Sequence, residues 1–195
     1  MAQADLLPYD FSALADTLHV YAGELKELLE SRRTKAAERQ AALDANAYAL
    51  TSDPRRLMVA PPALATPPYL NFAPLDNALT ALDGAAAHFG KARVLAQSKT
   101  LTAAKVAGIN LELSQAERKL TSPEGLPRRA WMQHLIYAPG WYTGYGAKTL
   151  PGVREGIEQA KYVEADAQIA ALGHVIAAEA EFVEHIAAEL DHLGM

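Results

Sequence analysis

The residues with the most suggestive spacing for metal chemistry lie near the end of the chain, where Glu189 and His192 form a Glu-x-x-His pattern. On a helix, this spacing puts two metal ligands on one face, as in di-iron helical bundles. Such sites also need a second Glu-x-x-His and two further glutamates in the bundle core, and this sequence holds a single copy. The nearby Glu181, Glu184 and His185 could equally be solvated or face the core. We therefore expect no metal site in this chain.

Two further patterns fail as catalytic or nucleotide-binding motifs. The segment from Gly140 to Thr149 ends in Gly-Ala-Lys-Thr, which has some features of a phosphate-binding loop. Such a loop needs glycine directly before lysine, so that backbone amides and the lysine meet the phosphates, and Ala147 interrupts that spacing. Three serines lack both a nucleophile elbow and a placed base. They are Ser12, Ser114 and Ser122.

The stretch from Gly125 to Gly152 has a composition that helix packing does not explain. It holds both tryptophans and three tyrosines in a chain that is only 7% aromatic. Its closely spaced glycines and prolines prevent a helix from running through it, because glycine permits positive φ and proline removes a backbone donor. A loop of this length is usually functional or disordered, and aromatic content argues against disorder. The aromatic residues are Trp131, Trp141, Tyr137, Tyr142 and Tyr145.

This stretch also carries a resemblance to a known family. Its motif, GLP-R-W-HLIYAPG-TGYG-TLPG, is similar to the C-terminal segment of the transferrin receptor-like dimerisation domain. That domain ends the zinc-dependent glutamate carboxypeptidases of the prostate-specific membrane antigen type, and the transferrin receptors. NLELSQAERKL (110–120) and LPYDF (7–11) fit other parts of it, so the resemblance spans roughly residues 6–193. Within the family, the chain resembles bacterial members of the carboxypeptidase group.

The resemblance implies one all-α domain over residues 1–195, similar to a four-helix bundle with long irregular connections. It implies a homodimer, and a contact between the aromatic loop and the protease domain of a longer parent chain. In the family, two zinc ions and the catalytic glutamate lie in that preceding protease domain, for which this sequence holds no counterpart. We therefore expect an isolated domain, cut from or encoded apart from its parent, with no catalytic residue and no metal of its own.

Two substrate-pocket positions follow from the same resemblance. In glutamate-specific members, a lysine–tyrosine pair in this loop binds the carboxylates of the substrate's C-terminal residue. The tyrosine matches Tyr145, but the lysine position matches Gly144, which puts a preference for C-terminal glutamate in doubt. Lys148 could substitute, although an exposed lysine without such a role is the simpler interpretation. Gly144 and Gly146 permit a tight turn, so we expect Tyr145 to point outward.

Two other functions are compatible with this sequence. The chain could be a non-enzymatic receptor or interaction module, as in transferrin receptors, if its parent has lost the zinc ligands. A free-standing metal-binding bundle would instead require bound metal in the purified protein. Zinc ligands at exopeptidase spacing in the upstream sequence of the full gene would decide for the enzyme.

Composition excludes several classes of protein. The net charge of −5 offers no basic surface for nucleic acid. Cysteine is absent, so disulfides and thiolate metal sites are excluded. No apolar run approaches the roughly 20 residues that span a bilayer, and the first ten residues lack the basic and apolar regions of a signal peptide. An export signal, to the periplasm or outside the cell, would belong to the longer parent chain.

Apolar residues spaced three and four apart predict four main helices and one short helix that together position the loop. The expected helices cover about residues 10–49, 74–98, 102–120, 151–162 and 164–193. The first is expected to bury Phe11, Leu14, Leu18, Tyr21, Leu25 and Leu28. The second is expected to bury Leu75, Leu79, Leu82, Ala86 and Phe89, and the third Val106, Ile109, Leu113, Ala116 and Leu120. The last is expected to bury Ile169, Leu172, Ile176, Ala180, Val183, Ala187 and Leu190.

The connection from Thr51 to Pro74 is rich in proline, which predicts extended backbone. It also carries apolar residues, so we expect it to pack along the bundle. These residues are Leu57, Met58, Val59, Tyr69, Leu70 and Phe72.

Two polar features of the expected helices remain. The run Arg32, Arg33 and Lys35 could indicate an anionic partner, but a solvated helix face beside Glu30 and Glu38 is the simpler interpretation. Asn110 falls near a buried helix face, where we expect its amide to find a hydrogen-bond partner, because buried polar groups are almost always paired.

Overall fold

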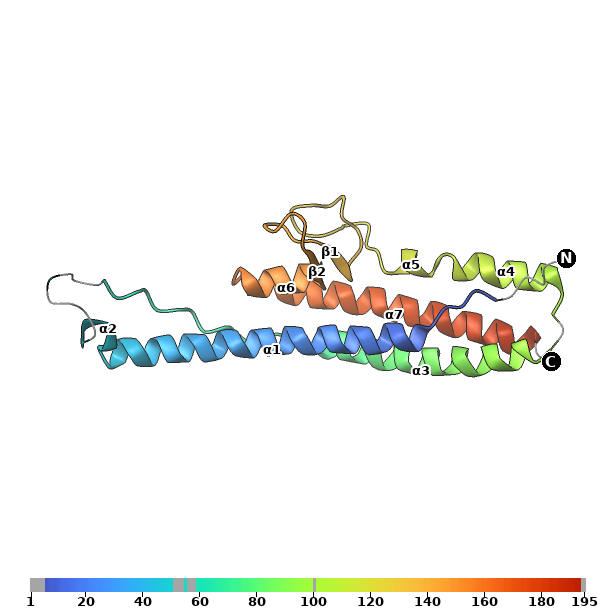
Figure 1. Ribbon diagram of the computed structural model, residues 1–195, viewed down its shortest axis with the longest axis horizontal. Helices are drawn as coiled ribbons and strands as arrows, with labels where there is room; N and C mark the ends of the chain where they lie inside the picture. Colours follow the sequence, from blue (N-terminus) through green and yellow to red (C-terminus); the bar gives the residue numbers. More distant parts are fainter. Residues whose placement is uncertain (1–5, 51–54, 56–58, 100, 194–195) are drawn as a thin grey trace.

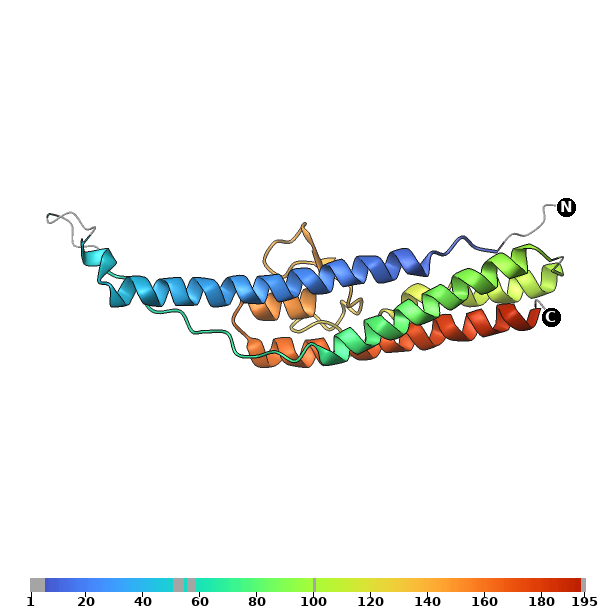
Figure 2. The same cartoon turned by 90° about the horizontal axis from the view of Figure 1, so that it is seen from below.

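A computed structural model describes residues 6–50, 55, 59–99 and 101–193. Three long helices, α1 (Phe11–Asp44), α3 (Ala73–Gln97) and α7 (Tyr162–Leu193), form an elongated bundle (Figures 1 and 2). Helices α4 (Ala103–Leu113) and α5 (Ala116–Lys119) contact α7 from another side. The short helix α6 (Pro151–Glu158) packs against the beginning of α7. The expected all-α class is confirmed.

The helix starts follow local capping chemistry. The Asp10 carboxylate accepts a hydrogen bond from the Ala13 amide at 3.0 Å, which satisfies one of the free donors of the first turn of α1. Thr102 caps α4 through the Lys105 amide in the same way. Pro74 lies in the first turn of α3, where its missing N–H costs no hydrogen bond.

The core lies between α3 and α7, and the buried faces expected for α3, for α7 and for residues 102–120 are all confirmed. In α1 the buried face differs from the expected one at every second position. Leu14, Tyr21 and Leu28 are only partly buried, because the alanine or leucine that follows each of them faces the bundle instead. The buried residues of α1 that lie on this face are Phe11, Ala15, Leu18, Ala22, Leu25 and Leu29.

Several helix ends differ from the expected ones. The first helix ends at Asp44, because Asn46 adopts φ 50°, and α2 (Ala47–Leu50) follows as a separate turn. The expected helix over 102–120 is broken after Leu113, where the Ser114 hydroxyl donates to the Leu111 carbonyl at 2.6 Å and competes with the helical pattern. The short helix ends at Glu158 and not near residue 162, because Ala160 (φ 56°) turns the chain into α7.

The second half of α1 reaches beyond the start of α7, and the proline-rich connection runs back along it (Figure 1). Two arginines of α1 hold this connection in place. Arg33 donates to the carbonyls of Pro67 and Pro68 at 3.3 and 2.7 Å, and Arg39 donates to Pro62 at 3.2 Å. Backbone carbonyls, and not only apolar side chains, therefore attach the connection to the bundle.

The apolar residues of the connection behave in two ways. Leu70 and Phe72 are buried as expected, but Val59 and Tyr69 are exposed, so that part of the prediction is wrong. Leu57 and Met58 lie outside the described residues.

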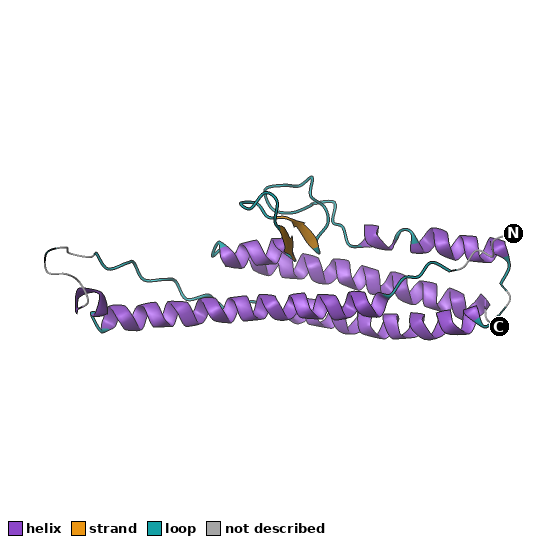
Figure 3. Ribbon diagram, viewed as in Figure 1, coloured by secondary structure: helices purple, strands orange, loops and turns teal. Residues whose placement is uncertain are grey.

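The long loop before α6 contains the two strands of the described chain, β1 (Tyr137–Pro139) and β2 (Ala147–Thr149), which the sequence did not predict (Figure 3). They pair antiparallel, with Ala138 opposite Lys148. Among the described helices, none is both long enough and apolar enough to cross a membrane.

Candidate functional site

The aromatic loop, residues 125–150, leaves α5 and returns to α6 on one side of the bundle (Figure 1). Its tip, residues 140–146, is closed at the base by a hydrogen bond from the Gly140 amide to the Gly146 carbonyl at 3.0 Å. Within the tip, the Gly144 amide donates to the Gly140 carbonyl at 3.2 Å, and Gly144 has φ +63°. Glycine suits this conformation because it lacks the Cβ that disfavours positive φ. The tip is thus a compact turn carried by the two strands.

A buried ion pair fixes the loop to α6. Arg129 donates two hydrogen bonds to Glu155, from Nη1 to Oε2 at 2.8 Å and from Nη2 to Oε1 at 3.0 Å. Both side chains are only 4% exposed. Glu155 Oε1 also accepts the Trp141 amide at 2.8 Å, so one carboxylate joins two distant points of the loop. The guanidinium lies 5.9 Å from the centre of the Trp141 ring, within the range of a cation–π contact.

The electrostatics of this pair favour the charged state. Burial alone would raise the pKa of Glu155, but the hydrogen bonds from Arg129 and Trp141 outweigh it, so the pKa is lowered. A paired, hydrogen-bonded carboxylate is the form in which a charge can be kept in a protein interior. The ion pair therefore places Trp141, and the tip that follows it, at a defined position over α6.

A second anchor joins the loop to α5. Glu117 Oε1 accepts hydrogen bonds from Tyr137 Oη at 2.7 Å and from His134 Nε2 at 2.9 Å. His134 Nδ1 accepts the amides of Ile136 and Tyr137, so the neutral ring carries its proton on Nε2. The hydrogen bond to Glu117, followed by burial and by the negative charge of Glu117, raises the pKa of Tyr137.

The residues expected in a substrate pocket lie in the tip. The Tyr145 side chain is fully exposed and points away from the core, as its flanking glycines predicted. A Cβ built at Gly144 would meet no atom within 4 Å, so a larger residue has space there. Trp131 and Tyr142 are also largely exposed, and Trp141 is 39% exposed. The loop therefore presents aromatic surface to solvent instead of burying it.

Lys148 does not behave as the free, exposed lysine that the sequence suggested. It forms an ion pair with Glu158 of α6, and its side chain is only 21% exposed. The pairing holds β2 against α6 and directs the ammonium group to this partner. The expected alternative cation for the tip is thus engaged inside the domain.

Sequence reasoning missed the residues that hold the loop. Nothing in the spacing distinguished Arg129 from Arg128, which pairs with Glu164 at the domain surface at 2.8 Å. Glu155 belongs to the short helix α6, and its burial depends on the loop that folds over it. Asn110 was expected to find a partner and does so: its Oδ1 accepts the Leu7 amide at 2.8 Å.

The described residues contain one group that could contact a metal ion, and it differs from the expected Glu-x-x-His. Glu112, His185 and Glu189 bring one ligand atom each to within 4.8 Å of one another, whereas His192 is exposed and outside the group. His185 Nε2 lies 3.6 Å from each carboxylate. Exposed acidic groups commonly lie this close without an ion, and we assign no metal to them.

The chain is similar to one known protein family and to proteins named as carboxypeptidases. The family model of the transferrin receptor-like dimerisation domain matches residues 70–184. The chain is 40% identical over 83 residues to a protein of Arabidopsis thaliana named probable glutamate carboxypeptidase LAMP1; this covers 43% of the chain and 12% of that protein. It is 46% identical over 41 residues to a probable glutamate carboxypeptidase of Arthroderma benhamiae, covering 21% of the chain and 6% of that protein. The matches thus span a small part of each relative.

Proposed function

The chain belongs to the family of transferrin receptor-like dimerisation domains, and from this premise we propose that it is the helical dimerisation domain of a glutamate carboxypeptidase-like zinc exopeptidase. In this role it forms homodimer contacts and contributes its aromatic loop to the pocket for the substrate's C-terminal residue. The names of both relatives favour a carboxypeptidase parent over the alternative of a non-enzymatic receptor module.

The observation that carries the proposal is the outward aromatic tip held by buried charges. A loop that ended in the bundle would bury its tyrosines, yet Tyr145 is fully exposed, while Arg129 and Glu155, which hold the loop at Trp141, are almost inaccessible. Such an arrangement has the properties of a substrate-positioning loop on a rigid scaffold. In the parent, the Tyr145 phenol would donate a hydrogen bond to a substrate carboxylate, a type of bond that contributes about 1.5–3 kcal/mol.

The two zinc ions of the proposed enzyme would lie in the parent's protease domain. The described residues of this chain do not fit such a centre, because Glu112, His185 and Glu189 provide a single three-donor group on partly exposed helix faces. The chain's own contribution is therefore to bind and orient the end of the substrate. Its partners are a second copy of the chain and the protease domain of the parent.

The deciding experiment is Tyr145→Phe in the full-length enzyme. For a peptide with a free C-terminus, kcat/KM should fall about tenfold or more, through a raised KM or a lowered kcat. The same change in the isolated chain should leave its melting temperature unaltered, since the side chain contacts only solvent. Unchanged kinetics in a correctly folded parent would remove Tyr145 from the pocket.

The dimerisation role is tested separately by sedimentation of the purified chain. A stable twofold interface buries about 1,200–2,000 Å² in total. We expect a concentration-dependent dimer. A monomer at high protein concentration would refute autonomous dimerisation and leave the interface to the complete parent.

A further inference from the structure

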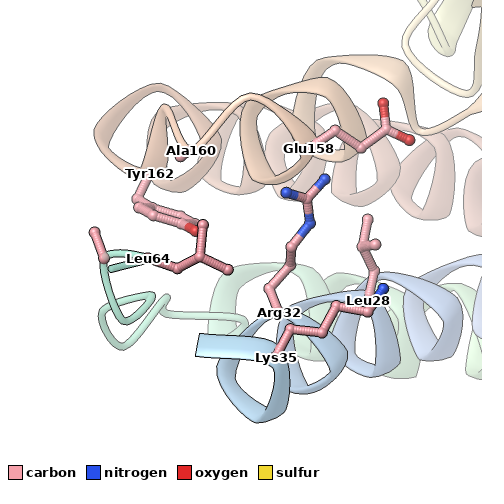
Figure 4. A pocket seen from close by; sticks show the side chains of 8 residues that line it. Leu28, Arg32, Lys35, Leu64, Glu158, Ala160 and Tyr162 are labelled. Atoms are coloured by element: carbon pink, nitrogen blue, oxygen red, sulfur yellow. The ribbon is translucent and has the colours of Figure 1, made fainter. Parts of the chain in front are cut away.

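A hollow of about 600 Å³ lies between the second half of α1, the proline-rich connection and the corner where α6 meets α7. None of the residues that line it belongs to the tip, and the function proposed above makes no use of it. Figure 4 shows Arg32 pointing from α1 toward α6, Lys35 lying along α1 beside Leu28, and Leu64 and Tyr162 at the other end of the hollow. Its volume is within the range of about 300–1,000 Å³ that small-molecule sites occupy.

The walls of this hollow are held by contacts outside it. The connection that carries Leu64 is tied to α1 by Arg33 and Arg39, which donate to proline carbonyls on both sides of that residue. Helix α6 is tied to α1 by Arg154, whose Nη2 donates to Glu24 at 2.6 Å. The hollow therefore exists before a ligand arrives, which lowers the ordering cost of binding.

Within the part of the chain that the structure describes, the hollow has two basic side chains without a partner and one acidic side chain that is already paired. Among the described residues, neither Arg32 nor Lys35 has a hydrogen-bond or ion-pair partner, whereas the adjacent Arg33 is engaged by Glu30. The acidic residue of the lining, Glu158, is held by Lys148. Two cations three residues apart on α1 thus face a space whose carboxylate is already neutralised. Both belong to the run of Arg32, Arg33 and Lys35 for which the sequence left an anionic partner as the alternative to a solvated helix face.

We propose that this hollow binds a ligand with two carboxylates on a short carbon chain, through Arg32 and Lys35. A guanidinium matches the planar carboxylate with two parallel hydrogen bonds, and the lysine ammonium serves as a point charge for the second. Leu28, Leu64 and the Tyr162 ring offer apolar contact to the carbon chain between them. The dicarboxylate can be a free small acid or two neighbouring acidic side chains of a peptide, which share this chemistry.

The test uses the unchanged chain and three probes: glutarate, inorganic phosphate and a glutamate-rich peptide. Binding is measured by calorimetry at up to about 10 mM, a concentration that reveals millimolar affinities, and located by NMR shifts of the Leu28 and Leu64 methyl groups. The double variant Arg32→Gln with Lys35→Gln removes both cations. The double variant Lys91→Gln with Lys105→Gln changes the net charge equally at exposed positions outside the hollow.

Glutarate should bind saturably, shift both methyl signals, and lose at least about tenfold in affinity in the Arg32/Lys35 variant only, as expected when charge-assisted hydrogen bonds are removed. Binding of the peptide alone, with the same losses, supports the proposal and identifies an acidic segment as the source. Phosphate binding as tightly as glutarate would overturn the dicarboxylate assignment. Equal weakening in both double variants, or no saturable binding to the unchanged chain, would overturn the site itself.

Discussion

Glu155 accepts hydrogen bonds from both the Arg129 guanidinium and the Trp141 amide, so a single carboxylate of α6 holds two points of the loop that are 12 residues apart in sequence. Removing one partner of such a buried pair leaves an uncompensated charge, which typically costs about 3–5 kcal/mol. Arg129→Met should therefore lower the free energy of unfolding by about this amount. Denaturant titration followed by tryptophan fluorescence measures it.

The matched variant is the double change Arg129→Met with Glu155→Gln. It removes both charges, while the glutamine carbonyl still accepts the Trp141 amide. We expect it to recover most of the lost stability, because replacing a buried ion pair by neutral groups is often close to neutral. If the double variant is as unstable as the single one, the pair is specifically required and charge burial is not the cause of the loss.

Much of the helical architecture could be predicted, because helix periodicity is a local property. The buried faces of α3 and α7 follow from apolar residues at spacings of three and four, and Asp10 and Pro74 mark helix starts. The hairpin of β1 and β2 could not, since each strand has only three residues and pairs through loop contacts. Glu155 has no local signal of burial, as its environment is created by residues 26 and 14 positions earlier in sequence.

The sequence predicted the outward direction of Tyr145 but not the ion pairs that hold the loop. Tyr145 was expected to point outward, and flanking glycines suffice for that expectation. Lys148 was expected to be free, but its partner Glu158 lies on a helix ten residues later, and their pairing depends on the register of β2 against α6. Ion pairs between two elements depend on tertiary packing, which the spacing of residues in the sequence does not reveal.

Glu179 makes stability depend on pH. Its side chain is fully buried in α7, and neither oxygen has a hydrogen-bond partner among the described residues. Burial, together with the negative charge of Glu117 and against the opposing charge of Lys119, raises its pKa to about 7. The folded protein thus binds this proton more tightly than the unfolded chain does, and the stabilisation is complete below about pH 4.5. It is lost as the pH rises to and beyond 7.

Glu179→Gln should abolish this dependence of stability on pH. It should also stabilise the protein by about 3 kcal/mol above neutral pH, because each unit of pKa shift corresponds to about 1.4 kcal/mol. Urea unfolding between about pH 4.5 and pH 8.5 measures the slope. Glu181→Gln, an exposed change on the same helix, is the control and should leave the slope intact. Parallel pH profiles for Glu179→Gln and the unchanged chain would contradict the assignment.

Gly173 lets α7 approach the start of α3 closely. A Cβ at this position would lie 2.8 Å from the Pro74 carbonyl oxygen, so the two backbones would have to separate. Gly173→Ala should destabilise the fold by about 1–3 kcal/mol, the usual cost of overpacking. Gly90→Ala in α3 is the opposite case, because its Cβ meets nothing within 4 Å and alanine favours the helix by about 0.5–1 kcal/mol. In thermal unfolding, the melting temperature should fall for Gly173→Ala and rise for Gly90→Ala.

Adding a cation at the tip should give the proposed parent enzyme a preference for substrates that end in glutamate. Lys148 is held by Glu158, so under the proposed function it cannot supply the cation that glutamate-specific members have at the Gly144 position. Gly144→Lys has space for its Cβ, and its positive φ costs about 1–2 kcal/mol for a residue other than glycine. In the full-length enzyme, this change should lower KM about tenfold for a peptide ending in glutamate relative to one ending in alanine, because one charged hydrogen bond is added.

Lys148→Gln supplies the comparison for that prediction. It should leave the ratio of the two KM values unaltered and reduce only the stability of the loop, since the ammonium group is directed to Glu158 and not to the tip. The two variants are compared by steady-state kinetics with both peptides and by the melting temperature of the isolated chain. If the unmodified parent already prefers C-terminal glutamate, and Lys148→Gln removes this preference, then Lys148 leaves Glu158 when substrate binds and the cation of the pocket is Lys148 after all.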